Sequence, residues 1–365
     1  MNQLFFCVQW HKNKATSWSG THYSVFKELS KRYDLVEYDY GIKKPYTFLT
    51  KLIYDKILHK YSTSSISSDK INKHYYNQIK KVINKNNLNK SFQFKLYPNI
   101  DNVHSYVYVD CLYCYLKYIY DNDIEAFKYW DDDISKVEKE LKHEEELLNK
   151  DNVTIFTMSR CLHDYLINIK KFSHNKVFFV GGGINLKYTE VDFTKKNGKR
   201  FLFSGKNFER KNGPLVVEAF KKVKEKYPES ELYISGCNVD IKEENVHVLG
   251  LLNFEHSSEY FKLCDYFVMP SIFEAYGLVF PEALSYGLPI IGRNAFEMPY
   301  FIKDGENGYI LNSQNSDELA SLMIKMIENK EMSKFVLENR KKYYDYYSWS
   351  SVVDRMCEVI NLKGE

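Results

Sequence analysis

The sequence has no apolar run near the ~18–20 residues needed to cross a lipid bilayer. The longest apolar run near the N-terminus, Leu4–Val8, has the length of a β-strand. It lacks the basic flank and cleavage site of a signal peptide. We therefore expect neither a membrane-spanning helix nor a secretory leader. No recognised nucleic-acid motif accompanies the basic residues, and we expect no nucleic-acid partner.

Cysteine is also scarce, and its pattern is not that of a disulfide framework. The seven cysteines are odd in number and are mostly scattered through apolar stretches, which is typical of buried thiols in a reducing cytoplasm. Cys111 and Cys114 form a single CxxC pair inside an aromatic run. Without a second pair, this spacing favours a helix over a zinc or redox site.

The composition is that of a globular protein with two domains. The chain has 365 residues, of which 44% are hydrophobic and 16% aromatic, too apolar for a disordered chain and too long for one ordinary core. The net charge is +3, but residues 42–90 hold eleven lysines against two aspartates. This local charge of +9 leaves −6 for the remainder. The basic segment is either a surface that rests on anionic lipid or a solvated lysine-rich face.

Strand and helix patterns alternate along the chain and restart after a polar linker at Leu186–Lys199. This alternation predicts an α/β protein with two Rossmann-like domains, residues 1–185 and 186–345, that face each other across a cleft. Residues 346–365 are expected to form a helix that packs back on the first domain. In such sheets, ligands bind at the carboxyl ends of the strands.

Two positions in the first domain are candidates for ligand binding. Gly20, in the loop before the helix predicted at Tyr23–Arg32, would let backbone N–H groups approach a diphosphate or an acceptor, or it serves only as a turn former. Asp110 follows the strand His104–Val109 and is either a ligand-facing carboxylate or the N-cap of a helix at Cys111–Tyr120.

Two further motifs in this half have structural explanations. The acidic run at 131–133 precedes a long helix, where capping explains it better than metal binding. The glycine triplet at 181–183 does not fit GxGxxG and is interpreted as a mobile turn that leaves the domain.

The stretch Phe273–Leu284 (FEAYGLVFPEAL) organises the second half of the sequence. A strand at Tyr266–Pro270 leads into a loop that carries Glu274, and a helix that begins near Leu278 carries Glu282. Amides at a helix start favour a phosphate, while carboxylates accept hydrogen bonds from sugar hydroxyls. We interpret the stretch as a sugar-nucleotide clamp, although glutamate is also common in first helical turns for electrostatic reasons alone.

A basic loop in the same half strengthens this interpretation. The loop GKNFERKNG follows the strand Arg200–Ser204 and places Lys206, Arg210 and Lys211 at one strand end. These cations can neutralise a diphosphate without a metal, and the alternative is a solvated basic loop.

The motifs SGKNFERKNGPLVVEAF, CDYFVMPSIFEAYGLVFPEALSYGLP and DGENGYIL resemble, in order and spacing, the C-terminal half of retaining family-4 glycosyltransferases with the GT-B fold. The segments WSGTHY, FTMSRCLHDYL and VGGGINL resemble the N-terminal half more loosely. The resemblance spans nearly the whole chain and is weakest over Ile42–Asn102.

The resemblance implies roles for individual residues. Glu274 would contact the transferred sugar, Glu282 the ribose, and Lys211 the diphosphate, while backbone amides at Gly277 and Leu278 would face the donor. The chain departs from the family at three positions: Lys206 stands where most members carry arginine, Asp110 where many carry histidine, and Tyr300 where many carry glutamate. The expected site residues are therefore Glu274, Asp110 and Lys211 for catalysis and Lys206, Lys211, Glu274, Gly277, Leu278, Glu282 and Gly20 for the donor.

The resemblance implies transfer of a hexose-type sugar from a UDP- or GDP-sugar to an acceptor hydroxyl, with retention of configuration and without a metal or other cofactor. The acceptor would be a glycan or a lipid-linked molecule, in bacterial-type surface glycan or lipid-linked oligosaccharide synthesis. The location would be cytoplasmic, with residues 42–90 at the inner face of the membrane. Two alternatives are a GT-B-fold sugar-nucleotide epimerase and an inactive pseudoglycosyltransferase that acts as an interaction subunit.

Overall fold

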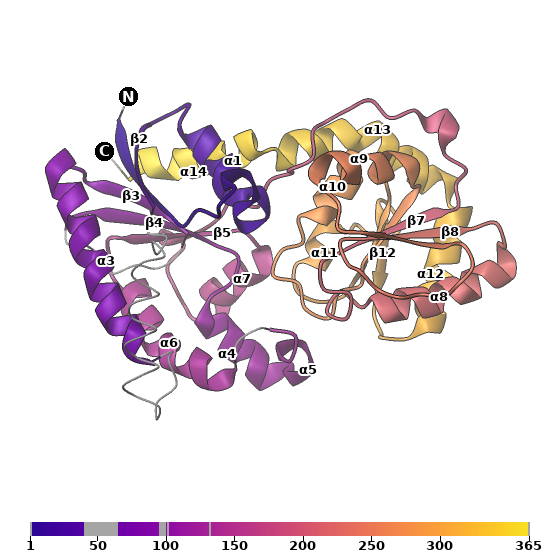
Figure 1. The fold of residues 1–365 in the computed structure, drawn as a ribbon, viewed down its shortest axis with the longest axis horizontal. Coiled ribbons are helices and arrows are strands. Elements are labelled where there is room, and N and C mark those ends of the chain that lie inside the picture. The colour runs from indigo at the N-terminus through magenta and orange to yellow at the C-terminus, as the bar shows by residue number, and fades with distance from the viewer. Residues whose placement is uncertain (1, 40–64, 95–99, 101, 131–132, 364–365) are drawn as a thin grey trace.

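The computed structural model describes residues 2–39, 65–94, 100, 102–130 and 133–363. Over these residues the chain folds into two six-stranded parallel sheets, each flanked by helices (Figure 1). The strand order is β2-β1-β3-β4-β5-β6 in the first sheet and β12-β11-β10-β7-β8-β9 in the second. The predicted α/β fold with two Rossmann-like domains is confirmed.

The first domain places its helices between successive strands. Its elements are β1 (Gln3–Val8), the 3-10 segment η1 (Lys14–Gly20), α1 (Thr21–Leu29), β2 (Asp34–Asp39), α3 (Ser65–Asn86), β3 (Lys90–Gln93), β4 (His104–Val109), α4 (Tyr113–Asn122), α5 (Ile124–Phe127), α6 (Ile134–Leu148), β5 (Val153–Thr157), α7 (Arg160–Asp164), the π-helical turn η2 (Tyr165–Ile169) and β6 (Val177–Phe179).

The second half of the chain repeats this pattern and ends in three helices. Its elements are η3 (Phe193–Lys195), β7 (Arg200–Ser204), α8 (Gly213–Lys226), β8 (Glu231–Ser235), β9 (Val246–Gly250), α9 (Phe254–Leu263), β10 (Tyr266–Val268), α10 (Val279–Ser285), β11 (Ile290–Arg293), α11 (Met298–Phe301), β12 (Gly308–Leu311), α12 (Ser316–Glu328), α13 (Lys330–Tyr347) and α14 (Trp349–Leu362).

Each sheet has one point where the strand order reverses. In the first sheet the chain adds β2 on one side of β1 and then β3 on the other. In the second sheet it builds β8 and β9 outward from β7 and then returns to place β10 on the other side of β7. Ligands of open α/β sheets bind outside the carboxyl ends of strands at such reversals. The loops after β1, β3, β7 and β10 are therefore the candidates for the site.

Strand β3 was not expected from the sequence. Its four residues, KSFQ, are too short and too polar to show a pattern, yet they pair in parallel with β1 and β4. Phe92 explains why the strand is central: its ring is fully buried and stacks on Phe6 of β1 with centroids 5.9 Å apart. A strand covered on both faces is stabilised mainly by such burial.

The chain passes between the domains twice, and the two passages lie together. The amide of Ile184 donates to the carbonyl of Tyr347 at 2.8 Å. A Cβ at Gly182 would lie 2.6 Å from the ring of Tyr276, and one at Gly183 would lie 2.2 Å from that of Trp349. The glycine triplet is therefore a closely packed crossing rather than the mobile turn that the sequence suggested.

The last helix belongs to the core of the first domain. Figure 1 shows α14 running back over the first sheet, next to α1. Arg32 pairs with Asp354 at 2.6 Å, and the hydroxyl of Tyr33 donates to Asn361 at 2.8 Å. Helix α14 buries an apolar face that includes Val352, Val353, Met356, Val359 and Ile360.

Acidic residues cap the starts of α4 and α6, but the cap of α4 is not the residue that was expected. Helix α4 begins at Tyr113 with Leu112 as N-cap, so the interpretation of Asp110 as a helix N-cap is wrong. The cap is supplied from α6, because Glu144 accepts the amides of Tyr113 and Cys114 at 2.9 and 2.8 Å. Asp133 caps α6 by accepting the amide of Lys136, as expected for the acidic run.

Some expectations fall outside the described residues. These are the helix expected at Tyr46–Lys60, residues 42–64 of the basic segment, and residues 131–132 of the acidic run. The helix expected at Lys70–Lys85 lies within α3. Over the described ranges, none of the helices combines the length and the apolar character that a bilayer crossing requires.

Candidate functional site

The centre of the site is an ion pair between Lys211 and Glu274. Lys211 ends the loop after β7, Glu274 lies in the loop after β10, and these strands flank the order reversal of the second sheet. The two residues are 7% and 6% exposed, and the Lys211 ammonium contacts the Glu274 carboxylate. Burial lowers the pKa of Lys211, and the opposing charge of Glu274 counteracts this. The site therefore holds a desolvated cation beside a desolvated carboxylate.

The loop that carries Glu274 is fixed by two arginines. The guanidinium of Arg210 donates to the carbonyl of Phe273 at 3.1 Å. Arg293 donates to the carbonyls of Ser271, at 3.1 Å, and Ile272. These contacts satisfy three successive carbonyls, so the backbone before Glu274 has one defined path. The hydroxyl of Ser271 then donates to the Glu274 carboxylate at 3.2 Å.

Gly277 allows the chain to turn tightly between Glu274 and α10. Its φ of +96° is a conformation that L side chains rarely adopt. A Cβ there would lie 2.8 Å from the Phe280 ring and 3.2 Å from Cγ of Glu274. Leu278 follows as the N-cap of α10. Gly277, one of the two positions predicted to present an amide, therefore lies directly beside the Glu274 side chain.

Asp110 faces this centre from the first domain. It directly follows β4, and its carboxylate is close enough to Glu274 for their charges to interact. Burial raises the pKa of Asp110 to about 6, while hydrogen bonds from the amides of Asp110 and Cys111 and from the Trp18 side chain favour its charged form. Both domains thus contribute acidic groups to one place, with Lys211 paired to one of them.

A second group of predicted residues meets at Asn185, in the crossing between the domains. The amide of Asn185 donates to the Glu282 carboxylate at 3.1 Å, and its side chain donates to the carbonyl of Ser19 at 2.8 Å. Gly20, with φ +91°, lies so close that an added Cβ would be 3.0 Å from Oδ1 of Asn185. Burial raises the pKa of Glu282 to about 7, against hydrogen bonds from the Asn185 and Leu186 amides.

Lys206 differs from the other predicted residues. It lies on the same loop as Lys211 but is exposed to solvent. The loop bends back at this point, because a Cβ at the neighbouring Gly205 would lie 2.6 Å from the Lys211 side chain. Lys206 can add positive charge at the rim of the site, but it does not join the buried pair.

No sequence pattern predicted the contacts that join the two domains beside this centre. Glu297, 1% exposed, accepts the Cys161 amide at the start of α7 at 3.0 Å. Burial raises the pKa of Glu297 to about 7, although the amides of Arg160 and Cys161 stabilise its charge. Tyr300 donates its hydroxyl to Asp164 of the same helix at 2.7 Å. The departure at Tyr300 therefore creates an inter-domain hydrogen bond.

Two other residues were present in quoted motifs but were not singled out, and a third, Trp130, lies outside those motifs. Trp18 lies in WSGTHY, where only the glycine was considered, and Asn185 lies in VGGGINL. Trp130 packs on Phe273 across the domains, with ring centroids 5.4 Å apart. Their importance depends on which loops meet, which local sequence does not determine.

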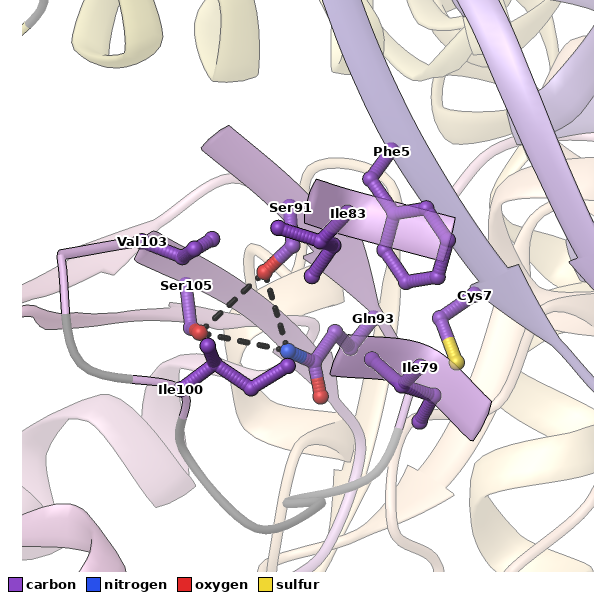
Figure 2. A pocket seen from close by; sticks show the side chains of 9 residues that line it. All are labelled: Phe5, Cys7, Ile79, Ile83, Ser91, Gln93, Ile100, Val103 and Ser105. Carbon is purple, nitrogen blue, oxygen red and sulfur yellow. Dashed lines mark hydrogen bonds between the residues drawn. The ribbon is translucent and has the colours of Figure 1, made fainter. Parts of the chain in front are cut away.

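A small cavity in the first domain is separate from this site. It lies between α3 and the sheet and has a volume of about 10 Å³, room for about one water molecule. Figure 2 shows Ser91, Gln93 and Ser105 hydrogen-bonded to one another among apolar side chains. The cavity is too small for a sugar or a nucleotide. Among the described residues, we find no group of three or more potential metal ligands.

Part of the chain is similar in sequence to known glycosyltransferases. Residues 187–343, most of the second domain, match the family described as "Glycosyl transferases group 1". An uncharacterized glycosyltransferase of Methanocaldococcus jannaschii is 24% identical over 201 residues, which cover 53% of this chain and 56% of that protein. The match therefore spans little more than half of the relative's length.

Solved structures match over both domains. Sucrose-phosphate synthase from Thermosynechococcus elongatus has a TM-score of 0.71 at 15% identity, covering 99% of each chain. The Anabaena HepE protein, solved in complex with UDP and glucose, has a TM-score of 0.62 at 13% identity, covering 99% of this chain and 100% of that one. At such low identity these likenesses concern the fold, which is of the GT-B type.

Proposed function

We propose that this chain is a retaining, metal-independent glycosyltransferase that moves a hexose-type sugar from a nucleotide-diphosphate sugar to an acceptor hydroxyl. The observation that carries the proposal is the buried Lys211–Glu274 pair at the order reversal of the second sheet, faced by Asp110 from the first domain. The match of residues 187–343 to a glycosyltransferase family supports it. The structure solved with UDP and glucose supports UDP as the first nucleotide to test.

In the proposed reaction the donor diphosphate lies against Lys211, and Lys206 adds charge from the rim. The bond between the anomeric carbon and the diphosphate oxygen breaks, and a bond to the acceptor oxygen forms on the same face. The acceptor proton passes to the departing diphosphate, so no protein nucleophile is required. A preorganised cation at the leaving group is worth about 3 kcal/mol, or roughly a hundredfold in rate, by analogy with an oxyanion donor.

The carboxylates have distinct proposed roles. Glu274 accepts hydrogen bonds from hydroxyls of the transferred sugar, and Glu282 from those of the ribose. Glu282 already accepts the Asn185 amide, so one of its oxygens also holds the crossing between the domains. Asp110, when ionised, faces the sugar as positive charge develops at its anomeric carbon. Gly20, Gly277 and Leu278 contribute backbone amides.

The first test is a thermal-shift screen with UDP-, GDP- and ADP-sugars. A ligand present at a hundred times its Kd stabilises the protein by about 2.7 kcal/mol. We expect one nucleotide class to raise the unfolding temperature. Lys211→Ala should abolish this shift, whereas Lys222→Ala, which removes a lysine paired with Asp317 elsewhere in the domain, should retain it. A screen without any stabilising nucleotide would contradict the proposal.

Product analysis tests the reaction class. With the stabilising donor and candidate acceptors, we expect a product with the donor's anomeric configuration by NMR and unchanged turnover in EDTA. Formation of an epimer from the donor alone would instead identify an epimerase. Donor binding without transfer or hydrolysis would identify an inactive subunit.

We further propose a lipid-linked or surface-glycan acceptor, reached from the inner face of the membrane. The support is the charge of +9 over residues 42–90. The protein should sediment together with vesicles of anionic lipid at low salt and stay in the supernatant at high salt. Equal binding to neutral and anionic vesicles would argue against this location.

A further inference from the structure

Contacts between the two domains gather beside Glu274, on the segment that leads into α11. Phe273, which precedes Glu274, is 1% exposed and belongs to an apolar cluster whose other buried members all come from the first domain. The ring of Phe296 packs edge-on against Phe273, with centroids 5.0 Å apart. Glu297 directly follows Phe296 and is the N-cap of α11. The position of Glu297 is therefore tied to the loop that carries Glu274.

The backbone before Glu297 is held in an unfavourable conformation. The φ angle of Phe296 is +53°, in the left-handed region that residues with a side chain rarely adopt. Such strain persists only where the surrounding structure enforces it. Here the Arg293 guanidinium lies 5.8 Å from the centre of the Phe296 ring and also donates to the carbonyls of Ser271 and Ile272. Segment 293–297 and loop 271–274 therefore form one packed unit.

Glu297 completes the cap of a helix in the other domain. Helix α7 begins at Arg160, and Figure 1 shows it on the side of the first domain that faces α11. The first amides of a helix have no partner within the helix. Ser159, the N-cap of α7, accepts the Leu162 amide at 3.3 Å, and Glu297 accepts the Cys161 amide at 3.0 Å. Each domain therefore satisfies part of the same helix start.

Helix α7 connects this contact to Asp110. It follows β5, which pairs in parallel with β4, and the Met158 amide after β5 donates to the carbonyl of Val109 at 2.8 Å. Asp110 is the next residue after Val109. By holding α7, Glu297 therefore also fixes the strand end that carries Asp110 relative to the loop that carries Glu274.

We propose that Glu297 is a positioning residue, which completes the cap of α7 from the second domain and so holds the two domains in the closed arrangement in which Asp110 faces Glu274. This inference rests on the proposed function and adds to it a residue that lies between the family-like motifs of the second domain. If the domains separate, the Cys161 amide loses its partner and returns to water. A donor that contacts both domains then meets only part of its site.

The charge of Glu297 makes this closure depend on pH. The ionisable groups that face it come from both domains: Arg160, Cys161, Tyr115, Tyr276, Tyr300 and Tyr347. Arg160 favours the ionised acid, but burial outweighs it and raises the pKa of Glu297 from 4.5 to about 7. In water the pKa would return to its ordinary value, so closure takes up a proton between these two pH values. The closed fraction should therefore fall as the pH rises through that window.

The chain offers a matched control in Glu144. This residue is 6% exposed and accepts the amides of Tyr113 and Cys114 at the start of α4, but its helix and its cap belong to the same domain. Glu144→Ala and Glu297→Ala therefore remove the same kind of bond, and only the second changes a contact between domains. Glu297→Gln keeps the length and an accepting oxygen without the charge, whereas Glu297→Asp keeps the charge on a shorter side chain. Unfolding curves report whether each variant is folded.

The first measurement does not need a donor. Small-angle X-ray scattering should give a larger radius of gyration for Glu297→Ala and Glu297→Asp than for the unmodified protein, Glu297→Gln and Glu144→Ala. In hydrogen–deuterium exchange, the Cys161 amide should exchange about tenfold faster in the first two variants, because it has lost a hydrogen bond to a carboxylate. If Glu297→Ala does not fold, Glu297→Asp provides the same comparison. An unchanged radius or an unchanged Cys161 exchange rate in Glu297→Asp would overturn the proposal and leave the proposed function intact.

A second measurement follows the radius of gyration with pH. In the unmodified protein it should increase as the pH rises from about 4.5 to about 7, because the closed arrangement loses its proton. The increase should be smaller in Glu297→Gln, whose amide does not titrate. Identical pH curves for the two proteins would mean that Glu297 does not move between a buried and an exposed state, and the inference would fail.

The third measurement connects the contact to turnover. The apparent affinity of a ligand falls with the fraction of molecules in the arrangement that binds it. Once the screen has provided a donor, Glu297→Asp should therefore raise its KM about tenfold. The kcat should change little, because saturating donor draws the domains together again. Glu297→Gln and Glu144→Ala should keep the KM of the unmodified protein. A lower kcat at unchanged KM in Glu297→Asp would indicate a loss of folded enzyme and overturn the positioning role.

Discussion

The buried pair of Lys211 and Glu274 allows the structural and catalytic roles of these residues to be separated. Removing one partner of a buried ion pair typically costs about 3–5 kcal/mol, because the other charge remains desolvated. In Lys211→Met, the Glu274 carboxylate would keep the hydroxyl of Ser271 at 3.2 Å, and Arg210, whose charge opposes that of Lys211, would still donate to the carbonyl of the neighbouring Phe273. We therefore expect a loss near the lower end of that range, about 3 kcal/mol.

Removing both charges should restore most of this stability. The double variant Lys211→Met/Glu274→Leu leaves no uncompensated charge, and replacing a buried pair with apolar side chains is often neutral or stabilising. We expect its free energy of unfolding to lie within about 1 kcal/mol of the unchanged protein, a coupling of about 3 kcal/mol between the two sites. Its turnover should nevertheless stay at least about a hundredfold low, because the diphosphate has lost its cation.

The assay is urea unfolding followed by circular dichroism and fluorescence, with the slope against urea compared between variants. Equal slopes show that the changes in midpoint are changes in stability. The reasoning is refuted if Lys211→Met unfolds within 0.5 kcal/mol of the unchanged protein, a margin set by the usual spread of surface substitutions. It is also refuted if the two single effects simply add in the double variant.

Three further predictions address other parts of the structure. Burial raises the pKa of Glu282 from 4.5 to about 7, so the folded state binds this proton more tightly than the unfolded state. The stability that this proton contributes is therefore lost as the pH rises from about 4.5 to about 7. Glu282→Gln should remove this dependence of stability on pH, which is at most about 1.4 kcal/mol per pH unit, and identical pH–stability curves for the two proteins would contradict this. Gly20→Ala should destabilise the protein and weaken donor binding, because its Cβ would lie 3.0 Å from Asn185. The control Gly305→Ala, with φ +80° and no atom within 4 Å of its Cβ, should lose only the free energy that a positive φ costs an alanine. Equal losses of unfolding free energy in urea would contradict the proposed clash with Asn185. Tyr300→Phe removes the hydrogen bond to Asp164 and should raise KM for the donor more than it lowers kcat, which steady-state kinetics can check; unaltered kinetics would mean that this contact does not help to hold the domains together.

The fold was predictable from sequence because its signals are local and repeated. Buried strands such as β1 and β4 appear as short apolar runs, and their alternation with helices implies parallel sheets. Strand β3 was missed because four residues carry too little pattern, and its identity comes from pairing with strands on both sides. The helix cap from Glu144 was missed for a related reason, since the carboxylate lies thirty residues away in sequence.

The site was predictable where one domain supplies it and not where two domains meet. Lys211, Glu274 and Gly277 follow from strand ends and a turn within the second sheet, and the structure brings them together. The contact of Glu297 with α7 and that of Glu282 with Asn185 depend on how segments distant in the sequence approach each other. Lys206 was predicted to bind the donor because it lies in the basic loop after β7, but its side chain is exposed and does not join the buried pair of Lys211 and Glu274.

The return of α14 has a consequence for how the molecule is made. The first domain buries Val352, Met356 and Ile360 under its own sheet, although these residues are synthesised after the entire second domain. During translation the earlier half must therefore wait with an uncovered apolar face until the later half has emerged. The two halves also share two neighbouring chain passages, so a single proteolytic nick in either one would leave them tethered by the other.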